Sequence, residues 1–275
     1  MSILYVVATP IGNLEDITFR AVETLKKVEY IACEDTRETK KLLTHLGISG
    51  KKLIPYHEHN EQKSAQKIIE LLEETDVALV SDAGTPCISD PGYRVVKLAV
   101  QNNIRVVPIP GAFAGAVALS ASGLPSDKFL FVGFLDKKES KKRKELEKYK
   151  NIGYTFIVYE SPKRVMKTLE LYAEVLPESD TVVAKELTKI HERFIYGKPK
   201  EIIEFFKENP DILKGEFVIL CHPEEKKEVS QKEIEEKIIE LKQKGLTKKE
   251  ITKEISKDFD IPKNKAYKLV LELLD

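Results

Sequence analysis

The segment SDAGTPCISDPG, residues 81–92, places two carboxylates, two glycines and two prolines within twelve positions. An apolar run, VALV, precedes it, and a helical pattern, YRVVKLAV, follows it. A loop of this composition between a buried strand and a helix could bind phosphate, hold a metal ion or support a cofactor. A plain tight turn is the fourth possibility, although a turn alone does not need both AGTP and SDPG.

Two of these possibilities are excluded by missing residues. The phosphate-loop pattern requires a lysine directly after its second glycine, and none follows here. Asp82 and Asp90 stand eight positions apart, with no histidine or further carboxylate at ligand spacing, so a metal site is not supported. Gly84 permits close approach of a ligand to the backbone, and Asp82 can accept a hydrogen bond from a hydroxyl or ammonium group. The pattern therefore predicts a cofactor ledge at Asp82, with Asp90 starting the next helix.

Other polar loops supply candidates for acid–base chemistry. The segment CEDTR contributes Glu34 and Arg37, and ELTKIHE contributes Lys185 and Glu186. We expect these four residues to lie near the chemistry, although the sequence does not identify the general base. Capping of a helix is the alternative role for acids in CEDTR, above all for Asp35. The two histidines of YHEHNE have no third ligand, so we expect surface histidines and no metal site.

Strands and helices alternate through the first half of the chain and place these loops. Apolar runs at 3–8, 30–33, 77–81 and 104–109 predict strands, and helical patterns follow each of them. This alternation predicts an α/β domain with a mostly parallel sheet covered on both faces. Ligands bind such sheets at the carboxyl ends of the strands, where the segment 81–92 lies. The helix that begins in PGAFAGAVALSASG is rich in small residues, which suits close packing or close approach of a flat ligand group.

The second half follows a different pattern. Strands are predicted at 155–160, 181–187, 192–197 and 215–221, and ELTKIHERFIYG resembles a hairpin, so the sheet is expected to be mixed. We divide the chain into an N-terminal α/β domain, 1–115, a C-terminal α/β domain, 116–222, and a linker with a helical extension, 223–275. The extension contains three short helices. It fits either a helix-turn-helix module or a cap that packs on the body.

Composition limits the partners. The 275 residues carry 45 basic and 45 acidic side chains, so a uniformly basic nucleic-acid-binding surface is excluded. Only the segment 136–150 is locally basic; it is either a solvated helix face or an RNA contact. The three cysteines fit no zinc or disulfide spacing, which indicates a reducing, cytoplasmic location. No run is long enough for a membrane span, so no membrane partner is expected.

Taken in order, several motifs resemble one family. VATPIGNLEDIT, CEDTR, SDAGTPCISDPG, PGAFAGAVALSASGLP, YESPKRV and ELTKIHE are similar to the ribosomal RNA small-subunit methyltransferase I family, within the tetrapyrrole methylase superfamily. The resemblance covers about residues 3–222, and the tail is similar to the helical extension of that family. The first loop, ATPIG, has fewer glycines than tetrapyrrole methylases often show, which favours the ribosomal RNA branch.

The resemblance implies two α/β domains with S-adenosylmethionine bound in the cleft between them. It implies methylation of the ribose 2′-oxygen of a cytidine in small-subunit (16S) ribosomal RNA, or in the assembled subunit, by a homodimer. It assigns cofactor contacts to Pro10 or Ile11, Asp82, Ala83, Gly84, Thr85, Gly111, Ala112, Phe113, Tyr159, Leu187, Glu216 and Phe217. A tetrapyrrole or corrin methyltransferase of the same fold and a non-catalytic RNA-binding protein are the alternatives.

Overall fold

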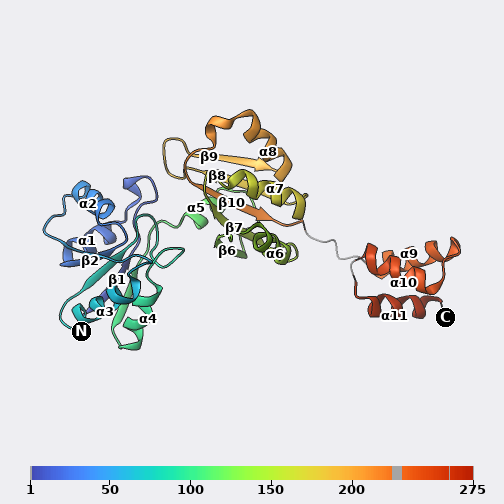
Figure 1. Cartoon of the computed structure of the whole chain (residues 1–275), viewed down its shortest axis with the longest axis horizontal. Helices are drawn as coiled ribbons and strands as arrows, with labels where there is room; N and C mark the ends of the chain where they lie inside the picture. Colours follow the sequence, from blue (N-terminus) through green and yellow to red (C-terminus); the bar gives the residue numbers. More distant parts are fainter. Residues whose placement is uncertain (1, 225–230, 260, 275) are drawn as a thin grey trace. The chain divides into compact units, whose positions relative to one another are not determined.

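The computed structural model describes residues 2–224, 231–259 and 261–274. The chain divides into two compact units, Met1–Glu224 and Glu225–Asp275 (Figure 1). The first unit contains two five-stranded sheets, and the second contains three helices. The two sheets with their helices agree with the predicted α/β fold class. Within the described residues, no helix is long and apolar enough to cross a membrane.

The first sheet is entirely parallel, with strand order β3-β2-β4-β1-β5. Its strands are β1 (Ile3–Val7), β2 (Tyr30–Cys33), β3 (Lys52–Pro55), β4 (Val77–Val80) and β5 (Arg105–Ile109). Its helices are α1 (Phe19–Lys27), α2 (Thr36–His45), α3 (Glu61–Leu71) and α4 (Tyr93–Gln101), with a short 3-10 turn, η1 (Leu14–Asp16). One apolar core lies between the sheet and α1 and α2, and another lies between the sheet and α3 and α4 (Figure 1). Both faces of the sheet are therefore covered, as expected for a parallel sheet.

The second sheet is mixed, as the sequence predicts. Its order is β6-β7-β10-β8-β9, and only β6 and β7 are parallel. The strands are β6 (Phe129–Phe134), β7 (Thr155–Glu160), β8 (Asp180–Lys185), β9 (Arg193–Gly197) and β10 (Phe217–His222). The helices are α5 (Ala114–Ser120), α6 (Glu139–Tyr149), α7 (Val165–Val175) and α8 (Pro199–Glu208), with a 3-10 turn, η2 (Pro210–Ile212). The antiparallel pair β8–β9 is the hairpin expected from ELTKIHERFIYG.

Helix α5 connects the two sheets, and its small residues allow it to pack closely on the second sheet. Ala118 and Leu119 are buried against β7 and β10 of the second sheet, in a core on the face opposite α6, α7 and α8. The first residues of this helix also reach the cavity described below. The domain boundary predicted between residues 115 and 116 falls inside α5, and it stays a prediction.

The three C-terminal helices have a core of their own. They are α9 (Gln231–Gln243), α10 (Lys248–Asp258) and α11 (Lys263–Leu274). Ile238, Ile251 and Val270 are fully buried in that core. Thr247 caps α10 through a reciprocal hydrogen-bonded pair with Glu250. Residues 225–230 of the predicted linker lie outside the described residues, and the helix-turn-helix interpretation stays a prediction.

A buried ion cluster lies at the carboxyl end of β7. The Glu160 side chain is inaccessible to solvent, and Lys142 Nζ and Arg164 Nε lie 3.5 and 3.1 Å from its two oxygens. Thr168 Oγ1 donates to Glu160 at 2.7 Å, and the Ser161 N–H donates at 2.9 Å. Burial lowers the pKa of Lys142. One carboxylate therefore holds together α6, the end of β7 and the start of α7.

Replacement of this carboxylate should destabilise the first unit. Glu160→Gln leaves two neighbouring cations without an anion, and breaking a buried pair in this way costs about 3 kcal/mol or more. Urea denaturation measures the loss. Glu147→Gln, at an exposed carboxylate of α6, is the matched control and should change the unfolding free energy by less than about 0.5 kcal/mol. Equal effects of the two substitutions would contradict the structural role of the cluster.

Candidate functional site

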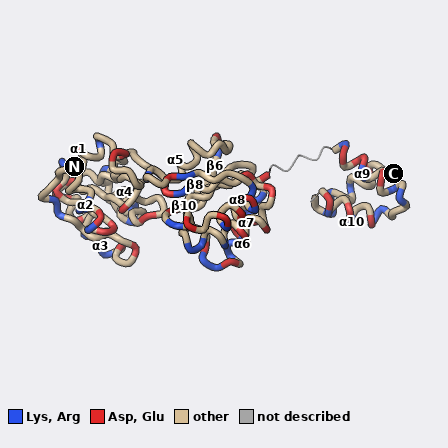
Figure 2. The backbone as a smooth tube through the Cα atoms, turned by 90° about the horizontal axis from the view of Figure 1, so that it is seen from above, with Lys and Arg blue, Asp and Glu red and all other residues tan. Residues whose placement is uncertain are grey.

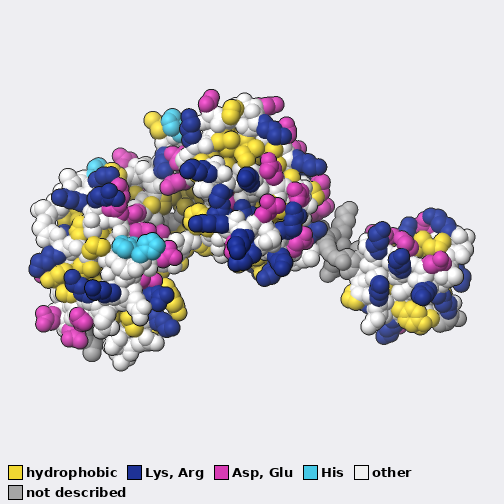
Figure 3. Space-filling model, viewed as in Figure 1, with side chains coloured by type: hydrophobic (Ala, Val, Ile, Leu, Met, Phe, Trp, Pro, Cys, Tyr) yellow, Lys and Arg dark blue, Asp and Glu magenta, His cyan; other side chains and the backbone are white. Residues whose placement is uncertain are grey.

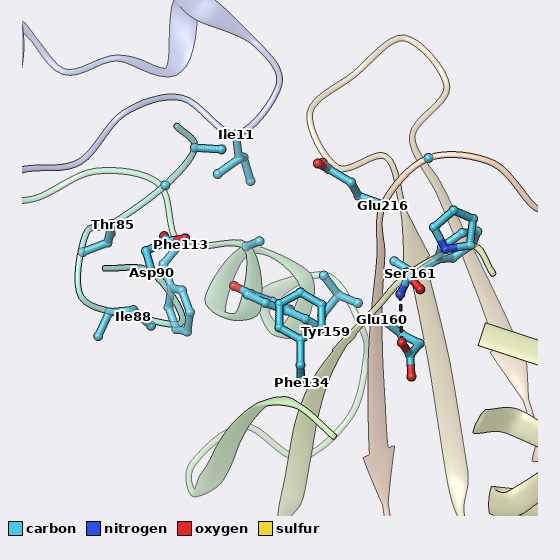
Figure 4. A pocket seen from close by; sticks show the side chains of 17 residues that line it. Ile11, Thr85, Ile88, Asp90, Phe113, Phe134, Tyr159, Glu160, Ser161 and Glu216 are labelled. Atoms are coloured by element: carbon cyan, nitrogen blue, oxygen red, sulfur yellow. Dashed lines mark hydrogen bonds between the residues drawn. The ribbon is translucent and has the colours of Figure 1, made fainter. Parts of the chain in front are cut away.

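A cavity of about 310 Å³ lies between the two sheets of the first unit (Figure 4). Loops after β1 and β4 and the start of α5 form one side, and the ends of β6 and β7 and the start of β10 form the other. Its lining residues are Ile11, Ala83, Gly84, Thr85, Ile88, Asp90, Phe113, Ala114, Phe134, Tyr159, Glu160, Ser161, Pro162, Gly215, Glu216, Phe217 and Val218. The volume is at the lower end of the range for small-molecule sites.

Aromatic side chains form much of the apolar wall. The ring centroids of Phe113 and Phe131 lie 5.0 Å apart. Phe131 and Phe134 both contact Tyr159 edge-on, with centroid distances of 5.0 and 5.7 Å. The Tyr159 hydroxyl accepts a hydrogen bond from the Gly115 N–H at 3.2 Å, which fixes its ring against α5. A rigid aromatic wall of this kind fits a flat heteroaromatic group.

The loop after β4 is held against the loop after β1 by backbone hydrogen bonds. The Thr9 N–H donates to Gly84 O at 2.9 Å, and the Gly84 N–H donates to Thr9 O at 3.1 Å. Gly84 has φ +84°, and a Cβ there would lie 3.3 Å from the Ile11 side chain. Thr85 Oγ1 donates to Ala112 O at 2.9 Å. Hydrogen bonds therefore join the loops after β1 and β4 to the entry to α5, and Ala83, Gly84 and Thr85 line the cavity. That this backbone supports a cofactor stays a prediction.

The two aspartates of the segment 81–92 do not have the predicted division of roles. Asp82 Oδ1 accepts a hydrogen bond from the Asp35 N–H at 2.9 Å, and Asp82 is absent from the cavity lining. Asp90 lines the cavity, while Gly92 is the N-cap of α4 and receives no side-chain cap. The prediction that Asp90 starts the helix is wrong, because two positive-φ residues, Cys87 and Ser89, turn the chain so that Asp90 points toward the cavity (Figure 4). The cofactor role of Asp82 stays a prediction.

Burial makes Asp90 unusually basic. Desolvation, helped by the nearby charges of Glu34 and Asp82, raises the pKa of Asp90 to about 7, against an opposing hydrogen bond from Ser81. Burial and the charge of Asp82 also raise the pKa of Glu34, which the charge of His57 opposes. Glu34 follows β2, and Asp82 and Asp90 follow β4. Because the carboxyl ends of neighbouring parallel strands meet at one sheet edge, these acids lie close together. A carboxylate with a pKa near neutrality can accept a proton at physiological pH.

The four predicted catalytic residues do not line this cavity. Glu34 lies beside Asp90, within its electrostatic reach. Arg37 is exposed and forms a bidentate ion pair with Asp35, which also caps α2. Lys185 and Glu186 line a separate cavity at the end of β8. Of the four, the structure brings only Glu34 close to the carboxylate in the cavity.

Eight of the predicted cofactor residues line the cavity: Ile11, Ala83, Gly84, Thr85, Phe113, Tyr159, Glu216 and Phe217. The other five, Pro10, Asp82, Gly111, Ala112 and Leu187, lie outside its lining. Gly111 has a packing role, since a Cβ there would lie 2.8 Å from the Cβ of Ala8. Leu187 is buried in the core under α5. Residues that the sequence prediction missed include Ile88, Asp90, Phe134, Glu160, Ser161 and Pro162; the motif YESP contains three of them and was the available signal.

The described residues contain no group of three or more His, Cys, Asp or Glu side chains placed to hold a metal ion.

Comparison with known proteins gives a consistent result. The profile of the Tetrapyrrole (Corrin/Porphyrin) Methylases family matches residues 3–203. Proteins named ribosomal RNA small subunit methyltransferase I are similar in sequence. The Halalkalibacterium halodurans protein is 48% identical over 79% of this chain and 74% of its own length. The Synechocystis protein is 43% identical over 99% of both chains.

Solved structures share the fold at low sequence identity. A diphthine synthase superposes with a TM-score of 0.62 at 13% identity, over 81% of this chain and 90% of its own. A cobalt precorrin-4 methyltransferase superposes with a TM-score of 0.57 at 16% identity, over 80% of this chain and 94% of its own. At these identities the likeness concerns the fold alone.

The raised pKa of Asp90 predicts a pH-dependent gain in stability for Asp90→Asn. Between pH 4 and 7 the folded protein retains a proton that the unfolded chain, with an aspartate pKa of 3.8, releases. The wild-type protein therefore loses this contribution as pH rises through 7, whereas the Asn variant does not. Urea denaturation at pH 5 and pH 8 should show the variant gaining stability relative to wild type at pH 8. A pH-independent difference would contradict the shifted pKa.

Proposed function

We propose that this chain, which belongs to the ribosomal RNA small subunit methyltransferase I family within the tetrapyrrole methylases, methylates the ribose 2′-oxygen of a cytidine in small-subunit ribosomal RNA. Its cofactor is S-adenosylmethionine. The observation that carries the proposal is the cavity between the two sheets, where an aromatic wall faces a rigid backbone ledge and a carboxylate.

The residues of the cavity fit this cofactor. The aromatic wall at Phe113 and Tyr159 suits the adenine ring, and the largely exposed carboxylate of Glu216 suits hydroxyl or ammonium groups. When bound, the cofactor supplies a methyl group on a sulfonium, a good leaving group that requires no metal. The contribution of the protein is to align the acceptor, to exclude water and to remove one proton.

We propose Asp90 as the group that removes this proton. It is the one carboxylate of the segment 81–92 that reaches the cavity. Its pKa of about 7 lets it accept the ribose hydroxyl proton while a large fraction remains ionised at neutral pH. Glu34 and Asp82 act on Asp90 through their charges, which favour its protonated form and so strengthen it as a base. In this proposal the predicted role of Glu34 near the chemistry becomes a positioning and electrostatic one.

The RNA substrate needs cationic surface outside the cavity. Acidic and basic side chains are intermixed over the face in Figure 3, whereas the backbone tube in Figure 2 is coloured as Lys or Arg at several positions along α6. Two members of the segment 136–150 are not available to RNA, because Lys142 is buried with Glu160 and Arg143 pairs with Glu174. We propose that Lys137, Lys138, Lys144 and Lys148 contribute sequence-independent phosphate contacts.

We further propose a homodimer and a cytoplasmic location. The resemblance to the family supports the dimer. The cytoplasmic location is supported by Cys33, Cys87 and Cys221, which are all free thiols in the structure. The alternatives are a corrin methyltransferase and a non-catalytic RNA-binding protein. They are less well supported, because the similar proteins are named ribosomal RNA small subunit methyltransferase I and the match covers most of their length.

A labelling experiment tests the activity. The protein is incubated with S-adenosylmethionine carrying a radioactive methyl group and with 30S-type small subunits, naked small-subunit RNA or a corrin precursor. The RNA is then digested and the labelled nucleoside identified. We expect label in 2′-O-methylcytidine. Label in the corrin, or RNA binding without any label, would instead support one of the two alternatives.

Asp90→Asn tests the proposed base. General-base catalysis contributes about 10²–10⁴-fold, so kcat should fall about 100-fold or more. The affinity for S-adenosylmethionine, measured by calorimetry, should change by less than about threefold, because the amide retains the shape of the side chain. A large loss of cofactor affinity would make Asp90 a cofactor ligand and not the base.

Asp82→Asn is the matched control for this experiment. Its carboxylate bonds the Asp35 N–H and does not line the cavity, so kcat should fall much less than in the Asp90 variant. The same calorimetric titration tests the cofactor contact that the sequence assigns to Asp82. Equal losses of kcat in both variants would contradict a specific role for Asp90.

A further inference from the structure

A second cavity, of about 450 Å³, is formed by the end of β8, the loop from β8 to β9, and the segment from η2 to the start of β10. It is lined by Lys185, Glu186, Ile190, His191, Glu192, Arg193, Asp211, Ile212, Lys214 and Gly215. Gly215 also lines the first cavity, so the two cavities adjoin at the start of β10. The residues of this second cavity have no role in the methyl transfer proposed above.

Two cations face each other in this cavity. Lys185 and Arg193 are directly opposite in the register of the β8–β9 pair, which places both side chains on the same face of the sheet. Lys185 is only 7% exposed. Throughout the described ranges, neither side chain has an ion pair or side-chain hydrogen bond. Like charges directly opposite each other destabilise a strand pair, and an anion between them would remove this cost.

The nearby carboxylates form no close ion pair with Lys185 or Arg193 in the described residues, although the charge of Lys185 acts on Glu186. Glu186 Oε1 accepts hydrogen bonds from Lys189 Nζ at 3.0 Å and from the Glu216 N–H at 2.9 Å. Glu192 Oε2 accepts from the Thr188 N–H at 2.6 Å. Asp211 is exposed and forms no ion pair with another described residue. Within the described residues, Lys185 and Arg193 therefore have no carboxylate within ion-pair distance, and His191 and Lys214 line the same cavity.

The loop beside these cations is rigid and is tied to the first cavity. Glu186 and Thr188 have positive φ angles, and the Asn13 N–H donates to Thr188 Oγ1 at 3.1 Å. A Cβ on Gly12 would lie 2.5 Å from the Lys189 side chain, so the loops after β1 and β8 are closely packed. Glu216, which lines the first cavity, also pairs with Lys189 at 2.9 Å. A ligand at the second cavity therefore has a fixed position relative to the first.

We propose that Lys185 and Arg193 bind a backbone phosphate of the RNA substrate and so hold the strand beside the cofactor cavity. The inference rests on the proposed function, because the phosphate belongs to that substrate. A phosphodiester carries one negative charge spread over two non-bridging oxygens, so each of two adjacent cations can bind one of these oxygens. The contact is independent of base identity, so it positions the strand without selecting its sequence. It also gives Lys185 a role in substrate binding in place of the predicted role near the chemistry.

Salt-dependent RNA binding tests this site. The full-length protein is titrated with a fluorescent single-stranded oligonucleotide carrying the methylation site, at several KCl concentrations and with saturating S-adenosylhomocysteine. Removing one phosphate contact should lower the slope of log affinity against log salt by about 0.7–1 and weaken binding on the order of tenfold at low salt. We expect this for Lys185→Gln and for Arg193→Gln. Arg193 is exposed, so its variant should fold normally.

Two controls make the outcome specific. Lys200→Gln, at an exposed lysine near the start of α8, should leave the slope unchanged, because α8 begins at the opposite end of the β8–β9 pair. The affinity of each variant for S-adenosylhomocysteine, by calorimetry, should match wild type. Inorganic phosphate is titrated separately to detect binding of the free anion.

The results separate this inference from the proposed function. Unchanged slopes in both variants would overturn the RNA contact, whether or not inorganic phosphate binds at the site. Such a result would leave the proposed function intact, provided that the wild-type protein still forms 2′-O-methylcytidine. Failure of the wild-type protein to bind or methylate the RNA would overturn the proposed function itself.

Discussion

The two backbone hydrogen bonds between Thr9 and Gly84 are the constraint on which the site depends. They join the loops that follow β1 and β4, two adjacent parallel strands whose carboxyl ends meet at one sheet edge. With these loops fixed, Ile11 and Thr85 face the second sheet, and Thr85 extends the connection to Ala112 at the entry to α5. Because α5 packs on β7 and β10, the same chain of contacts fixes the aromatic wall relative to the ledge.

The buried Glu160 and the half-buried Asp90 show how the surroundings decide the role of a carboxylate. Glu160 has two cations and two hydrogen-bond donors around its oxygens, and through them it holds three elements together. Asp90 has no ion pair in the described residues and has two acids nearby, so burial raises its pKa to about 7. The first arrangement stabilises the fold. The second stores a cost of ionisation that suits a proton acceptor, and such costs are typical of functional sites.

Much of the architecture was predictable from the sequence because its signals are local. Apolar runs followed by helical patterns predicted the parallel sheet, and the turn within ELTKIHERFIYG predicted the antiparallel hairpin. The ledge was predictable from Gly84 and the surrounding turn residues, since their backbone requirements are written in their residue types. The motif order also identified the family, which the sequence relatives confirm.

The sequence by itself thus determined the fold class, the family and the loops that form the site. Only the tertiary structure decided which side chains of those loops face the cavity. Asp82 and Asp90 are the same residue type in one loop, and the positive-φ turns at Cys87 and Ser89 lie between them, so that only Asp90 lines the cavity. Likewise, Lys142 reads as one of many lysines on a basic helix, yet it is buried against Glu160, a residue eighteen positions later. The direction of a side chain and its long-range partner depend on packing between distant segments, and local residue patterns do not encode them.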